Sequence, residues 1–153
     1  SACLVGSEMC IRDRLGIVID LFWRMAEGGI VFGRNDCCMT VADVLAAEGR
    51  VDLMAPYRGR YTTRRGFARL IARSGHRTLV DMMAAALDVH ARRVDVPARL
   101  DVALLKHFDA MTQVEIVSPA IFDAGFWFVR SDSGALVVKD PGDVPTWRIN
   151  SGS

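Results

Sequence analysis

The sequence lacks several features that would define a class of protein. No apolar run in its 153 residues approaches the ~20 residues that a helix needs to cross a bilayer. It has no CxxC pair, so we expect no zinc site and no other bound metal. The net charge of +1 indicates no particular class of partner, and no internal repeat marks a second domain. What remains is 51% hydrophobic residues, enough for one domain with a real core.

The amino-terminal stretch needs separate treatment. The residues from Cys3 to Arg14 resemble the translation of a transposase-type sequencing adapter, so we expect residues 1–14 to be an artefact outside the fold and 15–150 to form one domain. A signal peptide is not expected, because Asp20 interrupts the apolar run that follows. The remaining cysteines, Cys37 and Cys38, are adjacent and would form a disulfide only with strain. A reducing compartment, with synthesis in the cytoplasm, is therefore expected.

Helical and strand periodicities occupy different halves of the chain. Helical spacing of apolar residues, with glycine after each of the first three segments, predicts helices over 15–27, 37–48 and 63–73 and a fourth from Thr78. Short apolar runs then predict strands over 101–106, 112–117, 121–122, 126–130 and 135–139, with 145–149 as an edge strand. Helices followed by a strand meander predict an α+β domain, with the N-terminal helices packed on a C-terminal antiparallel sheet.

One stretch, residues 33–40, carries the main chemical signal. Asp36 suits the N-cap of the second helix, because its carboxylate can accept the free N–H groups of the first turn. Cys37 then lies where the helix dipole favours a thiolate. The alternative is that Cys37 and Cys38 are small buried residues at a helix start, and the sequence does not decide which of the two would face a cleft.

The order of residues around Cys37 resembles a known class of enzyme. Residues 30–37, an aromatic-Gly turn running into Asp-Cys, resemble the nucleophile segment of NlpC-type, papain-like cell-wall peptidases. A fuller resemblance, from Phe32 to Ile149, is to a family of uncharacterised phage and prophage proteins that is a distant branch of that fold. Its marks are residues 33–38, then 53–61 with Arg58-Gly59-Arg60-Tyr61, and then 147–149. The resemblance implies a papain-like α+β domain from a phage or prophage, associated with the tail.

The same resemblance implies a set of catalytic residues, and two of its positions differ here. Glutamine, Gln113, stands where the family has its catalytic histidine, and Asp123 stands at the third position, so the implied constellation is Cys37, Gln113 and Asp123. A Gly-Asp pair opens the preceding strand in the family, whereas this chain has Leu100-Asp101. Glutamine cannot act as a general base, which would cost about 10⁴ or more in rate. The N–H of Cys37 and neighbouring turn amides would form the oxyanion site.

Another histidine would have to supply the base if the enzyme is active. His107 ends the first strand of the sheet and is the best placed of the three histidines. His90 falls on the inward stripe of the fourth helix, which predicts a core or boundary position, and His76 lies in a turn and is expected to be solvated.

A band of eight arginines between Arg50 and Arg77 is the second signal, and it faces a single acid, Asp52. Guanidinium groups interleaved with tyrosines can bind anions, and the candidate anion-binding residues are Arg58, Arg60, Arg65 and Arg69. The alternative, which we favour, is a solvated helix face with arginines that pair with acids or cap carbonyls.

Three functions therefore remain open. The first is a tail-associated cysteine peptidase or amidase acting on peptidoglycan peptides, or descended from such enzymes. The second is an inactive assembly or binding module of the same fold, whose partners would be phage tail proteins and which would be carried in the virion. The third and weakest is anion or nucleic-acid binding by the arginine band. No cofactor is expected, and the sequence does not indicate an oligomeric state.

Overall fold

The computed structural model describes residues 20, 22, 27–109, 112–131 and 134–150. Its helices are α3 (Cys37–Ala47), the short 3₁₀ helix η1 (Ala55–Tyr57), α4 (Arg64–Arg73) and α5 (Leu79–His90). Its strands are β1 (Ala91–Arg93), β2 (Val102–Asp109), β3 (Val114–Asp123), β4 (Phe126–Ser131), β5 (Gly134–Val138) and β6 (Thr146–Ile149). The helix predicted over 15–27 lies largely outside the described residues.

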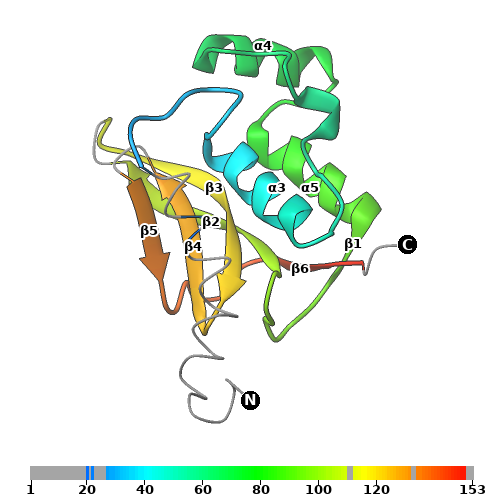
Figure 1. The fold of residues 1–153 in the computed structure, drawn as a ribbon, viewed down its shortest axis with the longest axis vertical. Helices are drawn as coiled ribbons and strands as arrows, with labels where there is room; N and C mark the ends of the chain where they lie inside the picture. Colours follow the sequence, from blue (N-terminus) through cyan, green and yellow to red (C-terminus); the bar gives the residue numbers. More distant parts are fainter. Residues whose placement is uncertain (1–19, 21, 23–26, 110–111, 132–133, 151–153) are drawn as a thin grey trace.

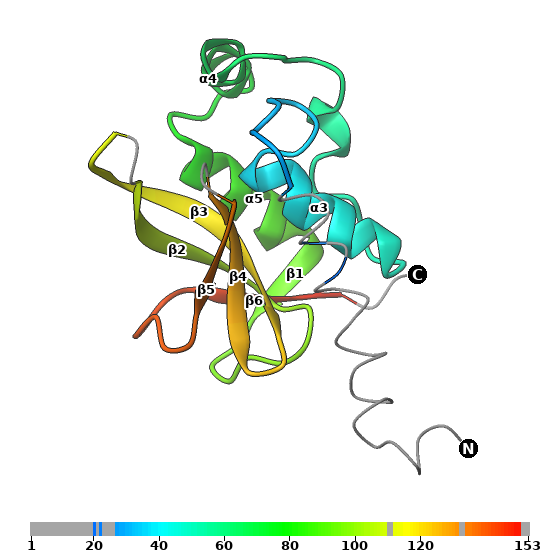
Figure 2. The same cartoon turned by 60° about the vertical axis from the view of Figure 1, so that its left-hand side comes forward.

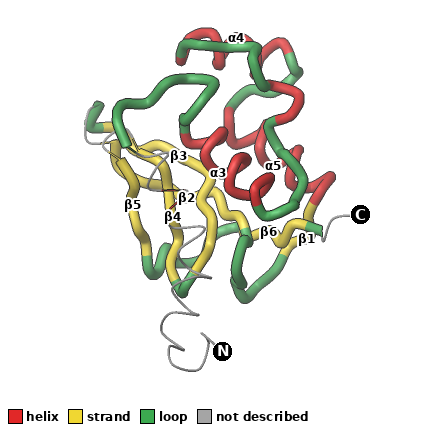
Figure 3. Tube along the Cα trace, in the orientation of Figure 1, coloured by secondary structure: helices red, strands yellow, loops and turns green. Residues whose placement is uncertain are grey.

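The helices form one layer and the strands the other (Figure 1, Figure 3). Helix α3 packs on β3 and β4, α5 packs on β1, β3 and β6, and α4 packs against α5. Figure 2 shows α4 set apart from the sheet, beyond the other two helices. The prediction of an α+β domain, with helices on an antiparallel sheet, is confirmed.

Side-chain hydroxyls set where α4 and α5 begin. Thr63 accepts a hydrogen bond from the N–H of Gly66, and Thr78 accepts one from the N–H of Asp81. Both helices begin one residue after the capping threonine, within one residue of the predicted starts. Helix α3 is apolar nearly all round, and seven of its eleven residues are buried.

The six strands are antiparallel in the order β1-β6-β2-β3-β4-β5, which corrects the strand prediction at three places. Strand β6, predicted at an edge, lies between β1 and β2. Strand β1 forms where an irregular segment was expected. Strand β3 runs through Ser118 and Pro119, which were expected to end it, because its pairing with β4 begins only at Ala120 and Pro119 interrupts no pairing on that side.

Two apolar clusters lie on the two faces of the sheet, and the larger one joins the helices to it. The larger joins α3, α5 and η1 to one face of the sheet and includes Leu45, Met83 and Trp147. The smaller uses alternate residues of the same strands, among them Leu105 and Trp127. His90, predicted for the core or its boundary, is instead exposed at the last residue of α5, and His76 is half-buried.

Candidate functional site

The turn before α3 fixes the start of that helix. Gly33 has a φ of +86°, in the region that favours glycine, and a Cβ on Gly33 would lie 2.3 Å from the carbonyl oxygen of Tyr61. Both the backbone conformation and the close approach of Tyr61 therefore require glycine at position 33.

Asp36 is the N-cap of α3, as predicted, and its carboxylate accepts four hydrogen bonds. Oδ1 accepts from the N–H groups of Cys38 at 3.1 Å and Met39 at 3.0 Å. Oδ2 accepts from the Gly33 N–H and from the Tyr61 hydroxyl, each at 2.7 Å. Asp36 is buried. Its role is thus to hold the turn, the helix start and the Tyr61 loop together.

Cys37 is the cysteine that faces open space. It is half-buried and lines a cavity of about 240 Å³, whereas Cys38 is fully buried. Among the other residues lining this cavity are Phe32, Asp36, His107, Ser118 and Arg130. The choice between Cys37 and Cys38, which the sequence left open, falls on Cys37.

The surroundings of Cys37 favour its thiolate. The two sulfur atoms lie 4.0 Å apart, and hydrogen bonding from Cys38 is the largest influence, lowering the pKa of Cys37. Burial and the negative charge of Asp36 oppose this effect on the pKa, and the Ser118 hydroxyl adds to it. The same contact, together with burial, raises the pKa of the Cys38 thiol well above its ordinary value.

His107 reaches the cavity from strand β2 and is buried. Its Nε2 lies 2.8 Å from the Ser118 hydroxyl oxygen on β3. Ser118 and Cys37 line the same cavity, and the Ser118 hydroxyl lowers the pKa of Cys37. A cysteine, a hydroxyl and an imidazole, drawn from a helix start and two neighbouring strands, thus line one cavity.

The structure does not bring Gln113 and Asp123 to this cavity. Gln113 is exposed in the turn between β2 and β3, has a φ of +60°, and donates its N–H to the Asp109 carbonyl. Asp123 ends β3 and lies 3.7 Å from Arg99, which also pairs with Glu48 at the opposite end of α3 from Cys37. An eleven-residue helix is roughly 16 Å long, so Asp123 is remote from the thiol.

Leu100 stands where the family has glycine, and its backbone has a conformation that favours glycine. Leu100 has a φ of +71°, a conformation that costs a residue with a side chain about 1–2 kcal/mol and costs glycine little. The chain therefore keeps, at Leu100, the backbone shape for which a glycine would be expected. The Leu100 side chain is buried, which offsets that cost.

Sequence reasoning missed Ser118 as a site residue, because Ser118-Pro119 reads as the end of a strand. Its place beside His107 depends on the register of β2 with β3, in which Leu105 opposes Ser118 and His107 opposes Ile116. That register is visible only once the turn between the strands is located.

Two of the four candidate arginines of the band make contacts within the fold. Arg58 binds two carboxylates, those of Asp43 and Asp52, and these contacts raise its pKa. Arg60 donates to the Pro56 carbonyl at 3.1 Å. Arg65 and Arg69 are exposed on α4. For Arg58 and Arg60 the structure thus supports the alternative of pairing and carbonyl capping.

Asp36, Cys37 and Cys38 bring three possible metal ligands within 4.8 Å of one another. The Asp36 carboxylate already accepts four hydrogen bonds, which fill its lone pairs. This cluster is therefore poorly suited to hold a metal ion. Among the described residues no helix is long and apolar enough to cross a membrane.

Fold and site together define an α+β domain that presents a cysteine at a helix N-terminus to a small cavity. The chain belongs to the family described as "Domain of unknown function (DUF6950)", whose model matches residues 14–148. No curated protein and no solved structure matched the chain. The α+β architecture is confirmed, and the papain-like fold stays a prediction.

Proposed function

We propose that this protein is a cysteine-dependent hydrolase, a peptidase or amidase, with Cys37 as the nucleophile and His107 as the general base. The observation that supports the proposal best is the shared cavity of Cys37, Ser118 and His107. The resemblance of residues 30–37 to NlpC-type enzymes suggests peptidoglycan peptides as substrates and a phage or prophage tail as the setting.

The reaction would proceed in two steps. The Cys37 thiolate attacks the amide carbonyl carbon, the C–N bond breaks, and protonated His107 gives its proton to the departing amine, with the Ser118 hydroxyl relaying it. Water then attacks the thioester while His107 takes a proton from it, and the carboxylic acid leaves as the thiol is restored. Three turn amides already bind Asp36, so the N–H of Cys37 itself is the backbone donor proposed for the oxyanion.

Digestion of purified peptidoglycan fragments, followed by mass spectrometry, tests this function. We expect new amine and carboxyl ends with the wild-type protein, none with Cys37→Ser, and a rate at least about 10²-fold lower with His107→Gln. Cys38→Ser is the matched control and is expected to retain turnover, because the serine hydroxyl keeps a hydrogen-bond donor beside Cys37. Equal product yields from wild type and Cys37→Ser would contradict the proposal.

A second candidate function is an inactive tail-assembly or binding module of the same fold. It is favoured by the Ser118 hydroxyl, which engages the His107 imidazole, and by the charge of Asp36, which opposes the thiolate. This module would show no turnover and would bind a tail protein equally well with Cys37→Ser.

A further inference from the structure

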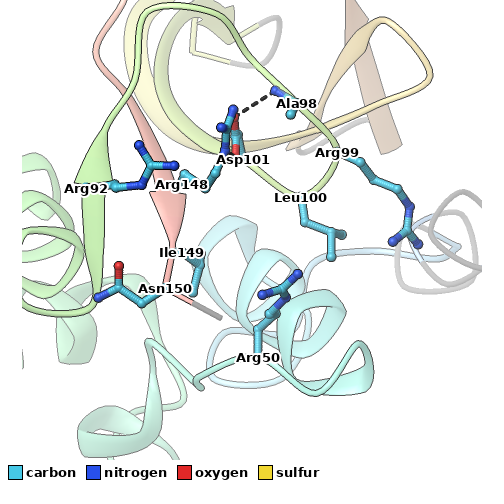
Figure 4. Close-up of a pocket in the computed structure, with 9 residues that line it drawn as sticks. All are labelled: Arg50, Arg92, Ala98, Arg99, Leu100, Asp101, Arg148, Ile149 and Asn150. Atoms are coloured by element: carbon cyan, nitrogen blue, oxygen red, sulfur yellow. Dashed lines mark hydrogen bonds and ion pairs between the residues drawn. The ribbon is translucent and has the colours of Figure 1, made fainter. Parts of the chain in front are cut away.

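A second, larger cavity lies away from Cys37, where β1 and β6 meet the loop before β2 and the loop after α3 (Figure 4). Its volume is about 540 Å³, within the range of small-molecule sites. Four arginines from separate segments line it: Arg50, Arg92, Arg99 and Arg148. It shares no lining residue with the Cys37 cavity.

Two of these arginines have carboxylate partners within the fold. Arg148 donates to both oxygens of the buried Asp101, at 3.0 and 2.9 Å, and also to the Val96 carbonyl. Arg99 pairs with Glu48 at 3.0 Å and lies 3.7 Å from Asp123. Asp101 is also held by the Ala98 N–H, shown by the dashed line in Figure 4. These contacts fix the cavity wall and neutralise Arg99 and Arg148.

The other two arginines are not neutralised. In the described part of the chain, neither Arg50 nor Arg92 lies within ion-pair distance of a carboxylate. Arg92 also stands directly opposite Arg148 on neighbouring strands, and like charges in that position are unfavourable. The carboxylate of Asp101 neutralises the charge of Arg148, so that of Arg92 remains. In Figure 4 Arg50 rises from the loop after α3 toward Leu100, and Arg92 extends from β1 toward Arg148.

We propose that this cavity binds a phosphate-bearing small molecule, with Arg50 and Arg92 as the residues that contact the phosphate. A phosphate monoester carries about −1.5 to −2 charges at neutral pH, which matches two uncompensated guanidinium groups better than the single charge of a carboxylate. The planar fork of each guanidinium fits two phosphate oxygens. Asn150, on the cavity wall, adds an amide donor, and the cavity is larger than phosphate alone needs.

Calorimetric titration of the full chain with inorganic phosphate, at constant ionic strength, tests this site. We expect saturable binding, weakened about tenfold or more by Arg50→Ala and by Arg92→Ala, because each loses charged hydrogen bonds to the anion. Both side chains reach solvent and neither holds a buried group, so both variants are expected to fold.

The exposed Arg34 supplies a matched control. Arg34→Ala removes the same charge away from this cavity and is expected to leave phosphate binding within about twofold of wild type. Absence of binding, or an equal loss in Arg34→Ala, would overturn the proposal. Acetate binding as tightly as phosphate would overturn the assignment of the ligand as a phosphate.

Discussion

At the scale of single residues, Gly33 and Gly59 illustrate two different reasons why a position favours glycine. Both have positive φ, +86° and +71°, but a Cβ at Gly59 would meet nothing within 4 Å, whereas one at Gly33 would meet the Tyr61 carbonyl. Displacing Tyr61 also endangers the hydrogen bond from its hydroxyl to the buried Asp36.

We therefore predict that Gly59→Ala lowers the free energy of unfolding by about 1 kcal/mol, the cost of the backbone conformation alone. Gly33→Ala is predicted to lower it by about 3 kcal/mol, since an unmet Asp36–Tyr61 bond adds about 1–3 kcal/mol. Urea denaturation measures both. Equal losses would show that the Tyr61 contact contributes nothing.

Prediction from single residues was correct where the role of a residue depends on its neighbours in the chain. The cap role of Asp36 follows from its own side chain and the next three amides, and the structure confirms it. The position of a base for Cys37 is not local. It depends on which residues of neighbouring strands lie beside each other. The resemblance implied Gln113, whereas in the fold His107 lines the cavity.

At the scale of elements, the backbone conformation of the turn between β3 and β4 restricts which residue types suit it. Asp123 and Phe126 are paired, so the turn has two residues, Ala124 and Gly125, with φ of +57° and +85°. Two positive φ values in a two-residue hairpin define a type I′ turn, which prefers asparagine or glycine at its first position.

Ala124→Asn is accordingly predicted to raise the free energy of unfolding by up to about 1 kcal/mol. Ala124→Val, at the same exposed position, is predicted to lower it, because a β-branched side chain tolerates positive φ poorly. The shift of the urea midpoint gives both signs. A loss with asparagine would contradict the turn assignment.

The elements also show where sequence patterns stop being informative. Helices α4 and α5 begin after Thr63 and Thr78, within one residue of the starts predicted from the sequence. The place of β6 between β1 and β2 could not be predicted, because strand order is set by pairing between residues some fifty positions apart. The apolar alternation that identifies a strand says nothing about its neighbours.

At the scale of the whole molecule, burial of Asp123 couples stability to pH. Burial raises the pKa of this carboxyl above 3.8, and the charge of Arg99 only partly opposes it. Between 3.8 and the raised value the folded state holds more protons than the unfolded state, so stability falls as pH rises through that window.

We predict that Asp123→Asn removes this fall. The stability of the variant relative to wild type should increase from about pH 4 upward and then level off, as measured by urea denaturation at a series of pH values. Asp95→Asn, at an exposed aspartate, controls for the loss of one charge. A difference between Asp123→Asn and wild type that does not vary with pH would contradict the burial argument.

The two cavities give the molecule two separate chemistries. One presents a thiol with a hydroxyl and an imidazole, and the other presents four arginines beside β1 and β6, at one end of the sheet order. Because they share no lining residue, Arg92→Ala is expected to leave the reactivity of Cys37 unchanged.

The most direct test of the central claim is the pH dependence of Cys37 alkylation in the full chain, located by peptide mass spectrometry, with Cys3 and Cys10 replaced by serine. Cys38 is kept, because its hydrogen bond lowers the pKa of Cys37. The account predicts rapid reaction in the folded protein with an apparent pKa below the ~8.5 of a free thiol, raised by Ser118→Ala. A thiol that stays unreactive until the protein unfolds would identify Cys37 as a packed core residue and contradict the account.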